Sequence, residues 1–265
     1  MTQPLICGFV QCFNESERGN IRRCLENMRQ FCDEICFYDD ASTDDSVKVA
    51  REYTPHIIEG DKHCFQRELF HKQLLLEYAL KLNPRWIWWQ DCDEILDRKG
   101  TEGDLRQLAE HAPAEVEAYS FFLVNLWRSE TFARTDGLFA TEWFIRLWRV
   151  IPEMHIKAEV GLDRPSYPCH IRNPVRSSIR MLHYHFVDYK RLLWSSVGGL
   201  TREELVEAAK SHFILDQRNL QCHRVPVDWF PKENVPCDRW KKPRSVPFEE
   251  MKTWRDIPDG EDLLC

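Results

Sequence analysis

Two carboxylates, Asp91 and Asp93, follow directly after the apolar segment WIWWQ (residues 86–90). Acidic side chains separated by one residue on a turn can bind the same divalent cation, and oxygen ligands suit Mg²⁺ or Mn²⁺. Such a cation keeps open positions for phosphate oxygens. The alternative is a solvated acidic turn that caps a helix, since short D-x-D matches are frequent. The apolar segment favours the metal site, because it places the acids where a buried strand reaches the surface.

A second acidic pair, Asp39 and Asp40, follows the apolar segment 34–38 in the same manner. An ionised carboxylate only accepts hydrogen bonds, so it suits the N–H groups of a nucleobase or the hydroxyls of a ribose. The alternative is that these acids cap the helix expected to begin near Asp44. One of the two can cap while the other binds, and we expect Asp40 to bind.

Two histidines lie in a later segment that alternates like a strand, residues 178–186. The two-residue period places His183 and His185 on one face, where imidazoles can complete a metal site or contact a phosphate. The alternative is that both are ordinary structural histidines. The candidate general bases are carboxylates among which spacing makes no choice: Glu142, Glu153, Glu159 and Asp163.

Strand and helix patterns alternate in the first hundred residues and would position these groups. The predicted elements are strand 5–13, helix 17–29, strand 34–38, a short helix from Asp44, strand 56–59, helix 65–82 and strand 85–90. This order predicts βαβ units and a parallel sheet, whose ligands bind beyond the carboxyl ends of the strands. Because three of the four strands end in polar or acidic residues, we expect a single site at that edge.

The second half of the chain is less regular. Strands are expected at 117–127 and 143–151, and Thr201-x-x-Glu204 is a capping box that opens a helix through about residue 213. Recurrent prolines after Arg224 predict a mostly irregular tail.

Composition excludes several classes of protein. The 36 Lys and Arg against 43 Asp and Glu give a net charge of −7, which argues against sequence-independent nucleic-acid binding. No apolar run approaches the roughly 18 residues of a membrane helix, and no signal peptide is recognisable. We expect a cytoplasmic protein without a transmembrane segment, with peripheral attachment at the inner membrane face as an alternative. The eleven cysteines form no C-x-x-C pair, so free thiols are expected.

Three segments resemble, in order, family-2 glycosyltransferases of bacterial type with a GT-A fold: CFNE (12–15), CDEICFYDDASTDDS (32–46) and WIWWQDCDEIL (86–96). LWR (147–149) and IRMLHYHFVDYKR (179–191) are similar more loosely. The resemblance implies a GT-A-like α/β fold, with a central, mostly parallel sheet flanked by helices. We expect this domain over residues 1–190, with a nucleotide-binding half (1–97) and an acceptor half (98–190), and a helical, Pro-rich extension (191–265) packed on it.

The same resemblance implies a metal-dependent inverting transfer of a sugar from a nucleotide-diphosphate sugar, with UDP-sugar favoured, to an acceptor hydroxyl. The acceptor would be a glycan, a lipid-linked or a small molecule, and the metal Mn²⁺ or Mg²⁺. Carried over residue by residue, the nucleotide would meet Gln11, Asn14, Glu15, Asp40, Asp91 and either Lys72 or Arg67. The metal would be held by Asp93 with Asp91 and His183, and the general base would be Glu159 or Asp163.

Two other functions remain open at this point. One is a catalytically inactive module that binds a nucleotide sugar or a glycan. The other is a sugar-nucleotidyltransferase-like enzyme, which the acidic loop CFNESERGN (residues 12–20) disfavours, because such enzymes use a Gly-rich basic loop for the triphosphate. No Gly-rich phosphate loop occurs elsewhere, so a bound nucleotide is expected to be held by a metal and side chains.

Overall fold

The computed structural model describes residues 2–64, 67–127, 129–136, 139, 141–156, 167–187 and 222–232. The chain divides into two compact units. The first comprises residues 1–123, 142–183 and 228–235, and the second comprises the remainder.

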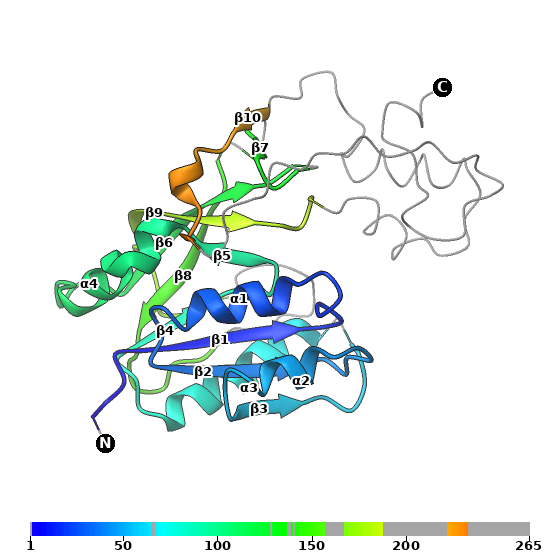
Figure 1. Cartoon of the computed structure of the whole chain (residues 1–265). Helices are drawn as coiled ribbons and strands as arrows, with labels where there is room; N and C mark the ends of the chain where they lie inside the picture. Colours follow the sequence, from blue (N-terminus) through cyan, green and yellow to red (C-terminus); the bar gives the residue numbers. More distant parts are fainter. Residues whose placement is uncertain are drawn as a thin grey trace. The chain divides into compact units, whose positions relative to one another are not determined.

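The first unit is built on an eight-stranded sheet with the strand order β3-β2-β1-β4-β8-β6-β9-β5 (Figure 1). One half is parallel and consists of β3 (His56–Glu59), β2 (Glu34–Asp39), β1 (Ile6–Cys12) and β4 (Trp86–Trp89). The antiparallel pairs involve β8 (Trp143–Arg149), β6 (Ala118–Asn125), β9 (Val175–His183) and β5 (Glu94–Leu96). The expected parallel strands are therefore present, but the sheet is mixed and not mostly parallel, because the strands from the second half of the chain pair in antiparallel fashion.

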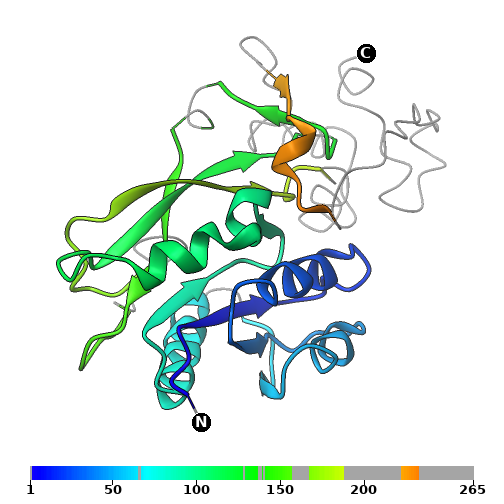
Figure 2. The same cartoon turned by 60° about the vertical axis from the view of Figure 1, so that its left-hand side comes forward.

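Helices cover both faces of the parallel half. They are α1 (Asn20–Met28), α2 (Ser46–Ala50) and α3 (Glu68–Lys81), while α4 (Leu105–Glu110) continues from a π-helical turn at Gly100–Asp104. In Figure 2, α1 and α3 lie on opposite sides of β1.

Alternate residues of the central strands enter two separate hydrophobic cores. Val10 and Trp88 belong to the core that α1 covers, whereas Phe9 and Ile87 belong to the core that α3 covers. This alternation follows from the two-residue period of a strand. Gly8 faces α1, and a Cβ there would overlap Cε of Met28 and Sγ of Cys32, so a larger residue would displace these two side chains.

Two elements differ from expectation around the acidic and histidine motifs. The D-x-D residues lead into strand β5 and do not cap a helix, so the capping alternative is wrong. The strand expected over 178–186 is β9, which starts at Val175 and ends at His183. Its partner begins at Glu94, which pairs with His183. His185 lies in the turn after β9 and not on the strand face.

The second unit contains a two-stranded antiparallel ribbon of β7 (Phe132–Arg134) and β10 (Cys222–Arg224). Arg134 is buried there, forms an ion pair with Asp136 (2.8 Å) and stacks over the ring of Trp127 at 4.5 Å. The helix expected over 201–213 lies outside the described residues, as does most of the Pro-rich tail, and the expected division at residues 97 and 190 stays a prediction.

Every cysteine whose side chain is described carries a free thiol, as expected. No helix in the described part of the chain is both long and apolar enough to cross a membrane.

Candidate active site

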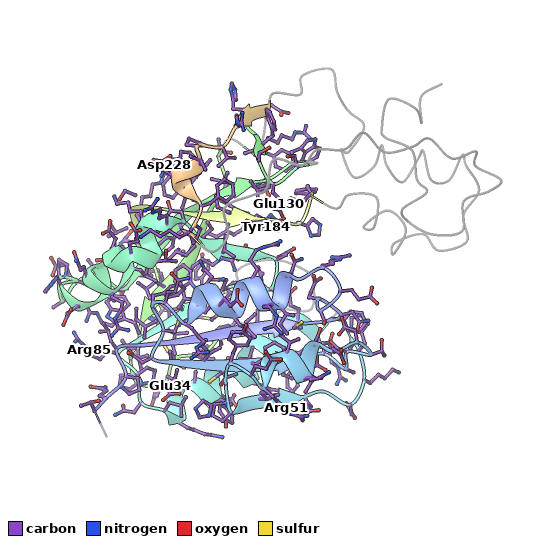
Figure 3. All side chains as sticks on the ribbon, viewed as in Figure 1. Glu34, Arg51, Arg85, Glu130, Tyr184 and Asp228 are labelled. Atoms are coloured by element: carbon purple, nitrogen blue, oxygen red, sulfur yellow. The ribbon has the colours of Figure 1, made fainter. Side chains whose placement is uncertain are left out.

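The carboxyl ends of β1, β2 and β4 lie at one edge of the first unit's sheet. The three strands are parallel neighbours, and the N–H of Asp40, directly after β2, donates to the carbonyl of Cys12 at the end of β1 (2.8 Å). Glu34 and Arg85, labelled in Figure 3, lie at the amino ends and thus at the opposite edge. The polar residues that follow the three strands therefore share one edge, as predicted.

Asp91 accepts hydrogen bonds from two buried side chains. Its Oδ1 accepts from Nε1 of Trp89 (3.2 Å), and its Oδ2 accepts from Nη2 of Arg146 on β8 (3.0 Å). Burial raises the pKa of Asp91, but the positive charges of Arg146 and Lys72 outweigh it and lower the pKa below its ordinary value. Asp91 is therefore ionised at neutral pH and held in one orientation.

Glu94 and Arg146 form a buried ion pair behind this turn. Oε1 of Glu94 lies 2.5 Å from Nη2 of Arg146, and both side chains are almost fully buried. Burial raises the pKa of Glu94, and the guanidinium of Arg146 opposes that rise. A buried charge is costly unless it is paired, and here each partner neutralises the other.

Asp93 faces His183 from the end of β9. Oδ2 of Asp93 lies 3.5 Å from Nε2 of His183, and each side chain keeps 17% of its surface exposed. Burial lowers the pKa of His183, but the carboxylates of Asp93, Glu94 and Asp91 outweigh burial and raise it. An oxygen and a nitrogen donor thus meet where a ligand can reach both.

Two cations lie over the ring of Trp89. Nζ of Lys72 is 3.6 Å from the ring centroid, and the guanidinium carbon of Arg146 is 4.2 Å from it. Lys72 is buried and also pairs with Glu68, one turn earlier on α3. The side chain of Lys72 thus contacts Trp89 and Glu68 within the protein. Arg67, the other residue expected to contact the nucleotide, is exposed.

Asp40 is almost fully buried and is already hydrogen-bonded. Its Oδ2 lies 2.7 Å from Nδ1 of His63, and the N–H of Cys64 donates to both carboxylate oxygens at 3.2 and 3.3 Å. Nδ1 of His71 lies 3.8 Å from Oδ1. The neighbouring Asp39 accepts from the N–H of Ser42 (2.8 Å) and holds the turn.

Gln11, on β1, contacts the histidine that lies beside Asp40. Its Nε2 lies 3.1 Å from Nδ1 of His71, whose ring stacks on Tyr38 with centroids 4.3 Å apart. Burial lowers the pKa of His71, partly opposed by the charge of Asp40, so the imidazole is neutral at pH 7. Oε1 of Gln11 is buried without a hydrogen-bond partner in the described part of the chain.

Asn14 and Glu15 connect the loop after β1 to the loop after β2. Oδ1 of Asn14 accepts from the N–H of Thr43 (2.8 Å), and the N–H of Glu15 donates to Ser46 (3.1 Å). Asn14 and Ala41 both adopt positive φ, 53° and 59°. The two loops therefore form a single hydrogen-bonded rim at this edge.

Residues 9–130 match the model of the family described as glycosyl transferase family 2. This segment is a family-2 glycosyltransferase domain. The match confirms the resemblance carried by the motifs and, with the mixed sheet, the expected GT-A-like fold.

Curated relatives of the family-2 segment are larger proteins. The chain is 28% identical over 111 residues to the SPbeta prophage-derived glycosyltransferase SunS of Bacillus subtilis, and equally to glycosyltransferase SunS of Bacillus phage SPbeta. These matches cover 41% of this chain and 24% of each relative. The chain thus matches about a quarter of the length of these relatives.

Solved structures with partial likeness include residues 1–349 of S. aureus TarS in complex with UDP-GlcNAc, at 13% identity and a TM-score of 0.35, over 46% of this chain and 35% of that chain. The mannosyltransferase PcManGT of Pyrobaculum calidifontis, in complex with GDP-Man and Mn²⁺, is 20% identical with a TM-score of 0.34. That likeness covers 48% of this chain and 36% of that chain.

The candidate site contains residues that the motifs did not indicate. Arg146 is the main one, and its signal was a charged residue in the middle of the apolar run FIRLW (144–148), where a buried guanidinium needs an acid. Nothing in the sequence around His63 indicated that its imidazole contacts the carboxylate of Asp40. The predicted general bases, Glu159 and Asp163, lie outside the described residues.

Proposed function

We propose that this chain is a metal-dependent glycosyltransferase that moves a sugar, with inversion, from a nucleotide-diphosphate sugar to an acceptor hydroxyl. The family match supports the class of reaction. One observation supports the metal: Asp93 and His183 approach to 3.5 Å at the sheet edge where Asp40 and Asp91 also lie.

The donor set suits a divalent transition metal. A carboxylate oxygen and an imidazole nitrogen are ligands that Mn²⁺ accepts, and Mg²⁺ accepts the carboxylate. Asp93 and His183 would hold the ion, with Asp91 as a further candidate ligand. When bound, the ion stabilises the charge that develops on the diphosphate as the bond to the sugar breaks.

The remaining roles belong to side chains of this chain. Asp40 would accept a hydrogen bond from the nucleobase and Asp91 one from a ribose hydroxyl, both as ionised carboxylates. UDP is the favoured nucleotide. Gln11 and the rim residues Asn14 and Glu15 would line the nucleotide site, and either Arg67 or Lys72 would contact the base or the diphosphate.

The general base would be Glu159 or Asp163. It would take the proton of the acceptor hydroxyl as that oxygen attacks the anomeric carbon from the face opposite the diphosphate. Glu159→Gln is expected to abolish transfer while the donor still binds. Normal transfer by this variant would assign the role to Asp163. The acceptor is proposed to be a glycan, a lipid-linked or a small molecule.

The test is a thermal-shift panel of UDP, GDP, CDP and dTDP, each with and without Mn²⁺. A ligand at 100 times its Kd stabilises a protein by about 2.7 kcal/mol. We expect one nucleotide to stabilise the wild type only with metal, and Asp93→Ala to lose that response. Asp104→Ala, a half-buried acid directly before α4 that pairs with Lys99, is the control and should respond as the wild type does. A wild type that responds to no nucleotide contradicts the proposal and favours an inactive module that binds a glycan.

A further inference from the structure

Asp91 is part of a closed ring of hydrogen bonds with Glu94 and Arg146. The backbone N–H of Asp91 donates to Oε2 of Glu94 (3.0 Å), and Oε1 of Glu94 accepts from Nη2 of Arg146 (2.5 Å). The same Nη2 donates to Oδ2 of Asp91 (3.0 Å). The ring thus fixes both the backbone and the side chain of Asp91.

Exposure differs sharply around the ring. The side chains of Arg146 and Glu94 are 3% and 2% exposed, while that of Asp91 is 36% exposed. Only Asp91 can therefore reach a ligand. Nε and Nη1 of Arg146 are buried without a hydrogen-bond partner among the described residues, and the ring of Trp89 lies against the guanidinium at 4.2 Å. The aromatic face supplies the contact that these N–H groups lack.

Trp89 completes the restraint on Asp91. It donates to Oδ1 (3.2 Å) while Arg146 donates to Oδ2. Each oxygen of the Asp91 carboxylate thus accepts one hydrogen bond from the protein and keeps a second lone pair for a ligand. Groups held in place before a ligand arrives bind it with less loss of conformational freedom.

We propose that Arg146 is a positioning residue for Asp91, which it holds, together with Trp89, in the orientation that accepts a hydrogen bond from the nucleotide. The inference rests on the proposed function, since it assigns Asp91 to the nucleotide site. The competing explanation is that Arg146 only forms a structural ion pair with Glu94. The two explanations predict different UDP affinities when this pair is replaced by neutral side chains.

A single and a double variant of the full chain separate these explanations. Arg146→Met leaves Glu94 buried without its partner, so it should lower the melting temperature and weaken binding of UDP with Mn²⁺. Arg146→Met with Glu94→Gln replaces the ion pair by neutral side chains, and Gln can still accept from the N–H of Asp91. We expect the double variant to recover most of the melting temperature, because neutral replacements of buried ion pairs are well tolerated.

The UDP affinity of the double variant decides between the explanations. We expect its Kd to stay raised about tenfold, the size of one lost charge-assisted hydrogen bond. Recovery of affinity together with stability would overturn the proposal. Arg146→Lys keeps a charged donor and should restore part of the affinity. The matched control is Arg149→Met, since Arg149 lies on the same strand and stacks over Trp86 at 4.5 Å without contacting Asp91.

Trp89→Phe tests the other donor, because phenylalanine keeps an aromatic ring for contact with the cations and removes Nε1. It should weaken UDP binding, whereas Trp88→Phe, which removes a donor to Gln90 on the opposite face, should not. Equal effects of the two substitutions on Kd would count against the proposal.

A measurement without ligand keeps this inference distinct from the proposed function. Asp91→Asn and Arg146→Met are combined in a double-mutant cycle read by urea unfolding. If Arg146 holds Asp91, their effects on unfolding are not additive. Additive effects overturn the inference even if UDP binds. A wild type that binds none of the nucleotides refutes the proposed function, while the cycle still decides whether Arg146 restrains Asp91.

Discussion

The imidazole of His63 lies 2.7 Å from the carboxylate of Asp40 (Nδ1 to Oδ2), and its ring stacks on Phe13 with centroids 3.6 Å apart. The side chain of Asp40 is 1% exposed and that of His63 is 40% exposed. A ligand that approaches Asp40 therefore meets His63 first, and a nucleobase would have to share or replace its hydrogen bond.

Asp40→Asn should weaken UDP binding in the presence of Mn²⁺ by roughly tenfold, because the amide replaces one acceptor by a donor. At saturating donor the turnover should be nearly unchanged, since Asp40 is not near the reacting bond in the proposed function. Calorimetry and a donor titration measure the two quantities. Asp33→Asn, at the opposite edge of the sheet, should leave the Kd of UDP unchanged. An unaltered donor KM in Asp40→Asn would rule out a base-reading role.

His183→Ala should weaken Mn²⁺ binding by about tenfold or more, since even outer partners of metal ligands contribute about that much. Electron paramagnetic resonance of free Mn²⁺ measures this without nucleotide. His111→Ala, which removes an exposed imidazole after α4, is the control. Equal Mn²⁺ affinity of the wild type and His183→Ala would remove His183 from the metal site.

Asp97→Asn should change how stability depends on pH. Burial raises the pKa of Asp97 above its ordinary value of 3.8, with the N–H groups of Gly100 and Arg180 opposing the rise. The folded chain therefore binds this proton more tightly than the unfolded chain. The stabilising contribution is full below pH 3.8 and is lost as pH rises through the raised pKa.

The asparagine variant cannot titrate, so its stability relative to the wild type should increase as pH rises through this window. Urea unfolding of both proteins from pH 3.5 upwards, at about half-unit steps, measures the difference. A difference that is constant with pH, or that falls, would contradict the assigned pKa shift.

Gly100→Ala should destabilise the first unit by about 1 to 3 kcal/mol, the usual cost of overpacking. A Cβ at this position would lie 2.3 and 2.5 Å from Cδ2 and Cγ of Leu96 and 2.8 Å from Cγ2 of Ile179. Leu96→Ala in the same chain should relieve part of the overlap, so the two substitutions together should cost less than their sum. Thermal or urea unfolding tests this, and strict additivity would show that the contact is relaxed elsewhere.

The parallel half of the sheet was predictable because its signals are local. Apolar runs that end in acids, such as the segment before Asp91, identify both the strand and the edge it reaches. The two-residue period of a strand explains why Phe9 and Val10 enter different cores, but the apolar run 5–13 did not by itself indicate two cores. Strand β5 was not predicted, because three residues are too few to show a hydrophobic period. Its strand conformation depends on pairing with β9.

The contacts of the site were less predictable than its position. Nothing in the neighbourhood of Asp91 indicates that a residue 55 positions later neutralises it. Likewise, a contact between His63 and Asp40 depends on the path of the loop after β3, which follows from packing and not from local pattern. The acids could be located from the sequence, but their partners required the fold.

The ion-pair partners of Asp91 and Asp93 come from beyond the segment that matches the family, which ends at residue 130. A fragment cut at that boundary would retain both acids and lose Arg146 and His183. Under the proposed function Asp91 and Asp93 act on the donor, so a chimera that exchanges the later half of the chain would also alter donor binding. A transplant meant to change the acceptor would therefore have to keep Arg146 and His183.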